Sequence, residues 1–138
     1  MSNSSPLDRE QIKKLARVHE EAAEVLMRKL KNSETESEKD VLFKQIHQQL
    51  GKAISYRQQD ISIILTMAKA DAKKLVSLMS GATKRLKKIE KVDDIVYYSG
   101  RILQAAVLLA SAPAGGALVA IATIEALFGE ADNDVGVS

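Results

Sequence analysis

Residues 43–89 decide the fold: FKQIHQQLGKAISYRQQDISIILTMAKADAKKLVSLMSGATKRLKKI. Apolar or small side chains recur along this stretch at steps of three and four residues, which is the spacing of one face of a helix. The steps average about 3.5 residues, the heptad period of helices that pack against one another. Arg57 and Asp60 interrupt the stripe, and Gly51 weakens its first half. The stretch is therefore either one long helix or two helices, and we favour a break near Arg57–Asp60.

A heptad stripe also predicts that the chain self-associates, because such stripes are typical of helices that pair with other helices. We expect the contacts between copies to involve ten apolar side chains of the stripe. They are Phe43, Ile46, Leu50, Ile54, Ile61, Ile64, Leu75, Met79, Leu86 and Ile89.

The prolines extend the helical prediction to most of the chain. Both lie outside its long middle, at Pro6 and Pro113, so no proline forbids helix between Leu7 and Ala112. The 138 residues suggest one domain, and the 46% apolar and 28% charged residues are near globular averages. We expect an all-α class: a helical bundle or hairpin with long heptad-patterned helices and a C-terminal apolar helical hairpin.

Capping signals place the boundaries. Ser5, Pro6 and Asp8 predict the start of a first helix, with Ser5 as the N-cap. Ser33, three residues before Glu36, is the better cap for the second helical region. The expected organisation is a disordered N-terminus (1–5), a single helical domain (6–128) and an acidic disordered tail (129–138). Within the domain we expect helix 6–31, a continuous or broken heptad helix 34–91, and a hairpin of helices 94–111 and 117–128.

The last third contains an uncharged segment, residues 102–124, ILQAAVLLASAPAGGALVAIATI. Its 23 residues meet the roughly 20 that a helix needs to span a bilayer. Pro113, Gly115 and Gly116 lie in its middle and predict a tight turn between two short helices. We expect the hairpin to contact a membrane through Ile102, Leu103, Val107, Leu108, Leu109, Leu118, Val119, Ile121, Ile124, Leu127 and Phe128.

Charge is segregated along the chain: the net charge is −1 over residues 1–40, +7 over 41–101 and −4 over 102–138. The basic residues before the uncharged segment suit an anionic membrane surface, and a solvated helix face is the alternative. They are Lys84, Arg85, Lys87, Lys88, Lys91 and Arg101. Nucleic acid is a less favoured partner, because no aromatic residue is interleaved with them. The basic flank predicts a cytoplasmic N-terminus and a cytoplasmic or membrane-associated protein, and residues 1–14 show no signal-peptide pattern.

Catalytic patterns are missing from the sequence. The absence of cysteine excludes disulfide scaffolds, thiolate catalysis and zinc fingers, and neither His19 nor His47 has a ligand partner at helical spacing. The only adjacent glycines, Gly115 and Gly116, lie in an apolar setting without a phosphate-binding lysine. We therefore expect no catalytic site, no metal and no cofactor.

Two functions remain open. The leading hypothesis is a non-enzymatic, self-associating helical protein that engages a membrane through residues 102–128, as an anchor or a pore-forming element. The alternative is a soluble helical-bundle assembly or adaptor protein that buries the apolar hairpin in an oligomer or partner interface. In that alternative the hairpin lies at the centre of the bundle and is covered by the preceding helices.

Overall fold

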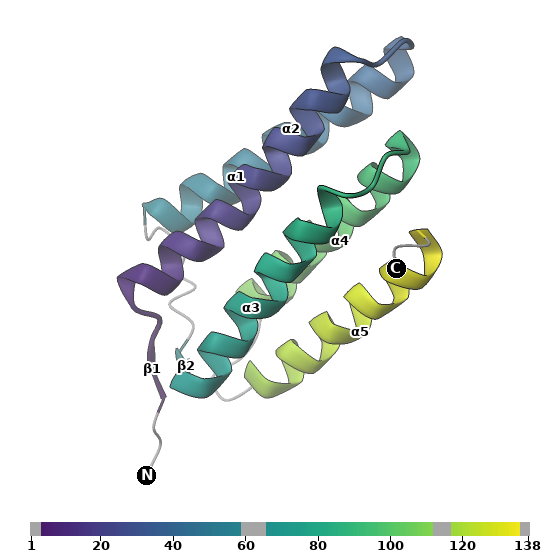
Figure 1. Cartoon of the computed structure of the whole chain (residues 1–138). Coiled ribbons are helices and arrows are strands. Elements are labelled where there is room, and N and C mark those ends of the chain that lie inside the picture. Colours follow the sequence, from purple (N-terminus) through teal and green to yellow (C-terminus); the bar gives the residue numbers. More distant parts are fainter. Residues whose placement is uncertain (1–3, 59–65, 112–116, 136–138) are drawn as a thin grey trace.

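The computed structural model describes residues 4–58, 66–111 and 117–135, and this part of the chain is almost entirely helical (Figure 1). Its elements, in order, are β1 (Ser4–Pro6), α1 (Arg9–Lys31), α2 (Glu36–Arg57), β2 (Thr66–Ala68), α3 (Lys69–Leu86), α4 (Val92–Ser111) and α5 (Ala117–Val135). The all-α class is therefore confirmed.

Successive helices run in opposite directions, so α1, α3 and α5 are parallel while α2 and α4 run the other way (Figure 1). α1 packs along α2, and α3 lies between α1 and α5. α4 packs on α2, α3 and α5, whereas the main contacts of α5 are with α3 and α4 alone. The expectation of a central, covered hairpin is therefore wrong for α5, which is an edge helix.

The start of α1 differs from the expected one. The N-cap is Asp8, not Ser5: its carboxylate accepts from the Gln11 amide at 2.8 Å, and the Gln11 side chain accepts from the Asp8 amide at 3.1 Å. This reciprocal capping box satisfies two amides that a serine one turn earlier would leave open. The preceding residues Ser4–Pro6 are extended and pair antiparallel with Thr66–Ala68, so they are ordered by the start of α3.

Two helices occupy the region expected to be one long or broken helix. α2 begins after Thr35, whose hydroxyl accepts from the Glu38 amide at 3.2 Å, so Ser33 is not the cap. α2 ends at Arg57, and α3 runs from Lys69 to Leu86 rather than to residue 91. Residues 59–65 lie outside the described part of the chain, and with them the expected break at Asp60 and the stripe residues Ile61 and Ile64.

The buried face of α2 is not the apolar stripe read from the sequence. The α2 side chains that face the core are Leu42, Ile46, Gln49, Ala53 and Tyr56. They also follow one another at steps of three and four, but one position away from the expected stripe except at Ile46. Because the buried set includes a glutamine, a search for apolar residues alone selects the neighbouring face, on which Phe43 and Ile54 are more than half exposed.

The C-terminus is helical for longer than expected. α5 continues to Val135, seven residues past the expected end at Phe128. Phe128 and Ala131 are buried, and the carboxylate of Asp132 accepts a hydrogen bond from the Tyr98 hydroxyl at 2.9 Å. Further packing and polar contacts with α4 therefore hold the first residues of the expected acidic tail in the helix.

Candidate interaction surfaces

The expected membrane-contact residues do not share one exposed surface. Five are buried, namely Ile102, Leu109, Ile121, Ile124 and Phe128, and Leu103, Leu108 and Leu127 are partly buried. Only Val107, Leu118 and Val119 are exposed, by 52%, 64% and 71%. Most apolar side chains of the hairpin are therefore used inside the bundle.

None of the described helices is both long enough and apolar enough to cross a membrane.

A strip of the outward surface of α5 between Leu118 and Gly129 is nevertheless uncharged, with the exposed Glu125 at its edge. Leu118 and Val119 are its bulky exposed side chains, and small or short ones follow at Ala122, Thr123, Ala126 and Gly129. The Thr123 hydroxyl donates to the Val119 carbonyl at 2.9 Å, so the polar atom on this face already has a partner within the helix. We call these six residues the α5 outer face.

Eight of the ten expected self-association residues lie in the described part of the chain, and they fall into three groups. Ile46, Leu75, Met79, Leu86 and Ile89 are buried within the chain itself, and Leu50 is partly buried. Phe43 and Ile54 are exposed, and Phe43 forms an edge contact with His47 at 4.6 Å between ring centroids. The heptad residues therefore mainly build the core of one copy.

The expected basic surface is divided among several directions. Arg85 forms an ion pair with Asp132 on α5, and Lys87 lies 2.9 Å from a carboxylate oxygen of Glu21 on α1. Arg101 stacks over the Tyr97 ring at 4.9 Å and donates to its hydroxyl. Lys84, Lys88 and Lys91 are exposed. A run that is continuous in sequence is thus dispersed, because helical neighbours point apart and α3 ends at Leu86.

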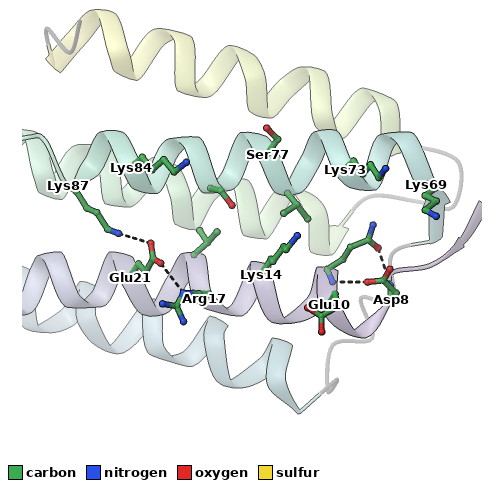
Figure 2. Close-up of a pocket in the computed structure, with 14 residues that line it drawn as sticks. Asp8, Glu10, Lys14, Arg17, Glu21, Lys69, Lys73, Ser77, Lys84 and Lys87 are labelled. Carbon is green, nitrogen blue, oxygen red and sulfur yellow. Dashed lines mark hydrogen bonds and ion pairs between the residues drawn. The ribbon is translucent and has the colours of Figure 1, made fainter.

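A groove of about 630 Å³ lies between the parallel helices α1 and α3 (Figure 2). Six basic side chains line it, together with three acidic ones. The basic residues are Lys14, Arg17, Lys69, Lys73, Lys84 and Lys87, and the acidic residues are Asp8, Glu10 and Glu21. Of these basic residues, only Lys84 and Lys87 belong to the basic surface expected from the sequence. The spacing of residues 69, 73, 84 and 87 places them on one helical face, and this spacing was a signal for Lys69 and Lys73 as well.

A buried polar network joins α1, α2 and α4. The Nδ1 atom of His19 lies 2.7 Å from the Gln49 side-chain oxygen, and the Gln49 amide nitrogen donates to the Ser99 carbonyl at 3.1 Å and to its hydroxyl at 2.9 Å. His19, Gln49 and Ser99 are completely buried. Because the Gln49 amide nitrogen donates to Ser99, its oxygen accepts, which assigns the proton to His19 Nδ1.

The protonation of this network follows from its burial. Desolvation lowers the pKa of His19 to about 4, with the charge of Lys52 acting in the same direction. Burial raises the pKa of the Tyr56 hydroxyl to about 12, and the Tyr56 ring stacks on His19 at 5.7 Å. The Nε2 atom of His19 and the Tyr56 hydroxyl have no hydrogen-bond partner among the described residues. The network is closed to solvent, and its hydrogen bonds join three helices in the core.

Metal chemistry gains no support from the part of the chain that is described, where no group of three or more histidine, aspartate or glutamate side chains is placed to hold an ion. Comparisons with protein-family models, with curated proteins and with solved structures find no significant match. The proposal below therefore rests on the exposed surfaces of the bundle.

Proposed function

We propose that this chain is a non-enzymatic helical-bundle assembly protein that pairs with a second copy through the α5 outer face. The observation that carries this proposal is an apolar strip on an edge helix, with Leu118 and Val119 exposed by 64% and 71% and Glu125 at its border already paired with Lys74. Bulky aliphatic side chains that no other described helix covers are typical of contact surfaces. This is the alternative of the two hypotheses, in a form that uses α5 rather than the heptad stripe.

The shape of the α5 outer face is self-complementary. Its bulky residues, Leu118 and Val119, lie in the first turn, and its small residues Ala126 and Gly129 lie about two to three turns later. When two copies of α5 pack antiparallel about a twofold axis, the bulky end of each helix meets the small end of the other. Small residues let two helix backbones approach closely, and twofold dimers are the commonest oligomers.

The charges around this face favour the same arrangement. Glu125 is occupied by Lys74 of α3, with 2.9 Å between the nitrogen and the carboxylate oxygen. Glu130 is exposed near the far end of the face. In an antiparallel pair Glu130 lies near the N-terminal turn of the other α5, where the helix dipole attracts negative charge.

The membrane hypothesis has less support. The described helices include none that is long and apolar enough to span a bilayer, and the most apolar side chains of the hairpin are inside the bundle. The exposed part of the hairpin is a narrow helix face, which suits a helix as its partner. Because one helix face buries less than a standard interface, we expect a weak dimer with a Kd roughly in the micromolar range.

Sedimentation equilibrium of the purified chain across a concentration series tests the proposal. The wild type should move from monomer to dimer, whereas Val119→Asp should stay monomeric because it places a carboxylate in the dry contact. Val41→Asp is the matched control: Val41 is also an exposed valine, by 45%, but lies on α2, so this variant should dimerise as the wild type does.

Gly129→Leu gives a second test that leaves the fold of the single chain intact. A Cβ added at Gly129 meets no atom within 4 Å, so the substitution is accommodated in one copy. The added side chain occupies the space that Leu118 of the second copy fills, and the dimer should weaken. A wild type that is monomeric at every concentration overturns the proposal, and flotation of the wild type but not of Val119→Asp with liposomes would replace it with lipid contact.

A further inference from the structure

The groove between α1 and α3 contains basic side chains that no acidic group neutralises. Lys14, Lys69, Lys73 and Lys84 have no ion-pair partner among the described residues. Figure 2 shows Lys14 extending from α1 into the space between the two helices, with Lys73 and Lys84 on either side of Ser77 along α3. These amines converge on one groove from two helices.

Pairing of basic residues on α3 depends on the direction in which they point. On the side that faces α5, Lys74 pairs with Glu125 and Arg85 pairs with Asp132. On the side that faces the groove, Lys69, Lys73 and Lys84 lack such a partner among the described residues, whereas Lys87, just past the end of α3, pairs with Glu21 of α1. The excess positive charge is therefore specific to the groove rather than general to the helix.

The acidic groups of the groove are already engaged. Glu21 is shared between Arg17, at 3.1 Å, and Lys87, at 2.9 Å. Asp8 caps α1, and Glu10 faces Lys13 at 4.0 Å. None of the three is therefore left for the unpaired lysines, and their mutual repulsion is relieved only by a bound anion or by solvent counterions.

Other features of the groove also suit an anion. The hydroxyl groups of Ser77 and Ser80 add hydrogen-bond donors to its α3 wall. No side chain caps the start of α3 at Ala68, so the N-terminal amides and the positive end of the helix dipole lie beside Lys69. The first turn of α3 also contains Asp71, but the described α3 side chains that line the groove are all basic or neutral.

The dimensions and lining select the class of anion. Lys69 and Lys87 are separated by about 27 Å at the rise of an α-helix, so a single small anion cannot contact both. Among the residues that the structure describes, no aromatic side chain lines the groove, so these residues offer no base stacking of the kind that single-stranded nucleic acid uses. Val18 and Val76 are the aliphatic side chains that line it in the described part of the chain, too few to anchor the apolar face of a partner helix.

We propose that this groove is a binding site for a linear chain of linked phosphates. The phosphate oxygens would be met in succession by Lys69 and Lys73, by Lys14 from the opposite wall, and by Lys84. Lysine ammonium groups recognise phosphate as point charges and tolerate a flexible chain, whereas the planar arginine fork fits one phosphate at a fixed angle.

Isothermal titration calorimetry with three phosphate probes tests the site on the full chain. Long-chain inorganic polyphosphate should bind most tightly, tripolyphosphate more weakly, and orthophosphate least, because affinity grows with the number of lysines bridged. Lys14→Gln and Lys73→Gln should each raise the Kd for the long chain about tenfold, the effect of losing one charge-assisted hydrogen bond. Lys44→Gln, an exposed lysine on α2, is the matched control and should leave the Kd unchanged.

Thermal melts separate a binding role from a structural one. Without ligand, Lys14→Gln and Lys73→Gln should melt no lower than the wild type, because they remove repulsion rather than a contact. With polyphosphate, only the wild type and Lys44→Gln should show the full rise in melting temperature. Absence of saturable binding, or an equal loss in Lys44→Gln, overturns the proposal. Tighter binding of single-stranded RNA or of a polyglutamate peptide at the same lysines overturns the assignment to a phosphate chain.

Discussion

The α1–α2 hairpin and the α4–α5 hairpin have helices of similar length, with 23 and 22 residues in the first and 20 and 19 in the second, but they bury different chemistry. The first hairpin encloses His19, which bonds to Gln49 with no solvent contact. Between α4 and α5 the buried side chains are mainly aliphatic, and the hydrogen bond from Tyr98 to Asp132 lies near one end of the pair. Directional bonds in the core allow one register, whereas an apolar contact tolerates sliding.

The largest effect is expected where the polar network is cut. Gln49→Leu keeps nearly the same volume but leaves His19 Nδ1 and the Ser99 hydroxyl without their partner, all completely buried. Each orphaned buried group costs roughly 1–3 kcal/mol, so we expect a loss of about 4 kcal/mol in the free energy of unfolding, measured by urea denaturation.

Gln45→Leu is the control for that variant. Gln45 lies one turn earlier on α2 and donates to the Val96 carbonyl of α4 at 3.1 Å, but it is only half-buried. Its loss should cost about 1 kcal/mol. Equal losses for the two variants would show that the complete burial of the network adds nothing to its contribution.

The next effect is a loss of stability in mild acid. The pKa of His19 is about 4 in the folded chain and 6.5 for an ordinary histidine, so only the unfolded chain takes up this proton between those values. The contribution of neutral His19 to the free energy of unfolding is complete above pH 6.5. It is lost as the pH falls toward 4, by about 3 kcal/mol in total.

Urea midpoints at pH 7 and pH 5 measure this loss in variants that lack one histidine. His19→Phe removes the titrating ring and should flatten the dependence on pH, whereas His47→Gln replaces an exposed ring and should retain it. If the urea midpoint of His19→Phe falls between pH 7 and pH 5 as much as that of the wild type, the acid sensitivity comes from carboxylates instead.

A smaller effect is expected at the rim of the second hairpin. Tyr98→Phe removes the hydroxyl that donates to Asp132 at 2.9 Å but keeps the ring, which stacks on Phe128 at 6.1 Å. We expect a loss of about 1 kcal/mol, with faster amide hydrogen exchange confined to the last turns of α5. Faster exchange in α1 as well would mean that the two hairpins unfold as one unit.

The smallest effect tests the interruption of the heptad stripe. Arg57 donates two hydrogen bonds to Glu20 across the first hairpin, at 2.7 and 2.6 Å, and its guanidinium holds the pKa of the Glu20 carboxyl below its usual value. If Arg57 interrupted an apolar seam between helices, Arg57→Leu would stabilise the chain by completing that seam. Because the ion pair is lost, we expect Arg57→Leu to melt at a slightly lower temperature than the wild type, and this difference should shrink in high salt.

How far the sequence predicts the fold depends on what each helix face contains. In α3 the apolar stripe is the buried face, since Leu75, Met79 and Leu86 all lie in the core. In α2 the buried face includes Gln49, whose partner His19 is on another helix, so periodicity alone selects the wrong side. A polar residue enters a core only when a distant residue satisfies it, and a search for local patterns does not see that partner.

The α5 outer face and the groove were also hard to predict from the sequence, because both depend on which helices pack together. The first half of α5 is apolar or small nearly all round, so the sequence shows that it needs cover but not which face receives it. The groove joins Lys14 of α1 with Lys73 of α3, residues that only the folding of the chain brings together. The continuous run of basic residues was the more visible signal, yet its members point toward α1, toward α5 and into solvent.

The pairing of Ser4–Pro6 with Thr66–Ala68 has a consequence for the order in which the chain folds. The contacts between α1 and α2 are local and cost little loop entropy, whereas this short ladder closes a loop that contains both of those helices. The ladder between β1 and β2 should therefore form after the α1–α2 hairpin and appear late in refolding. On a ribosome, the N-terminal residues would wait for the start of α3 to emerge before they acquire their partner.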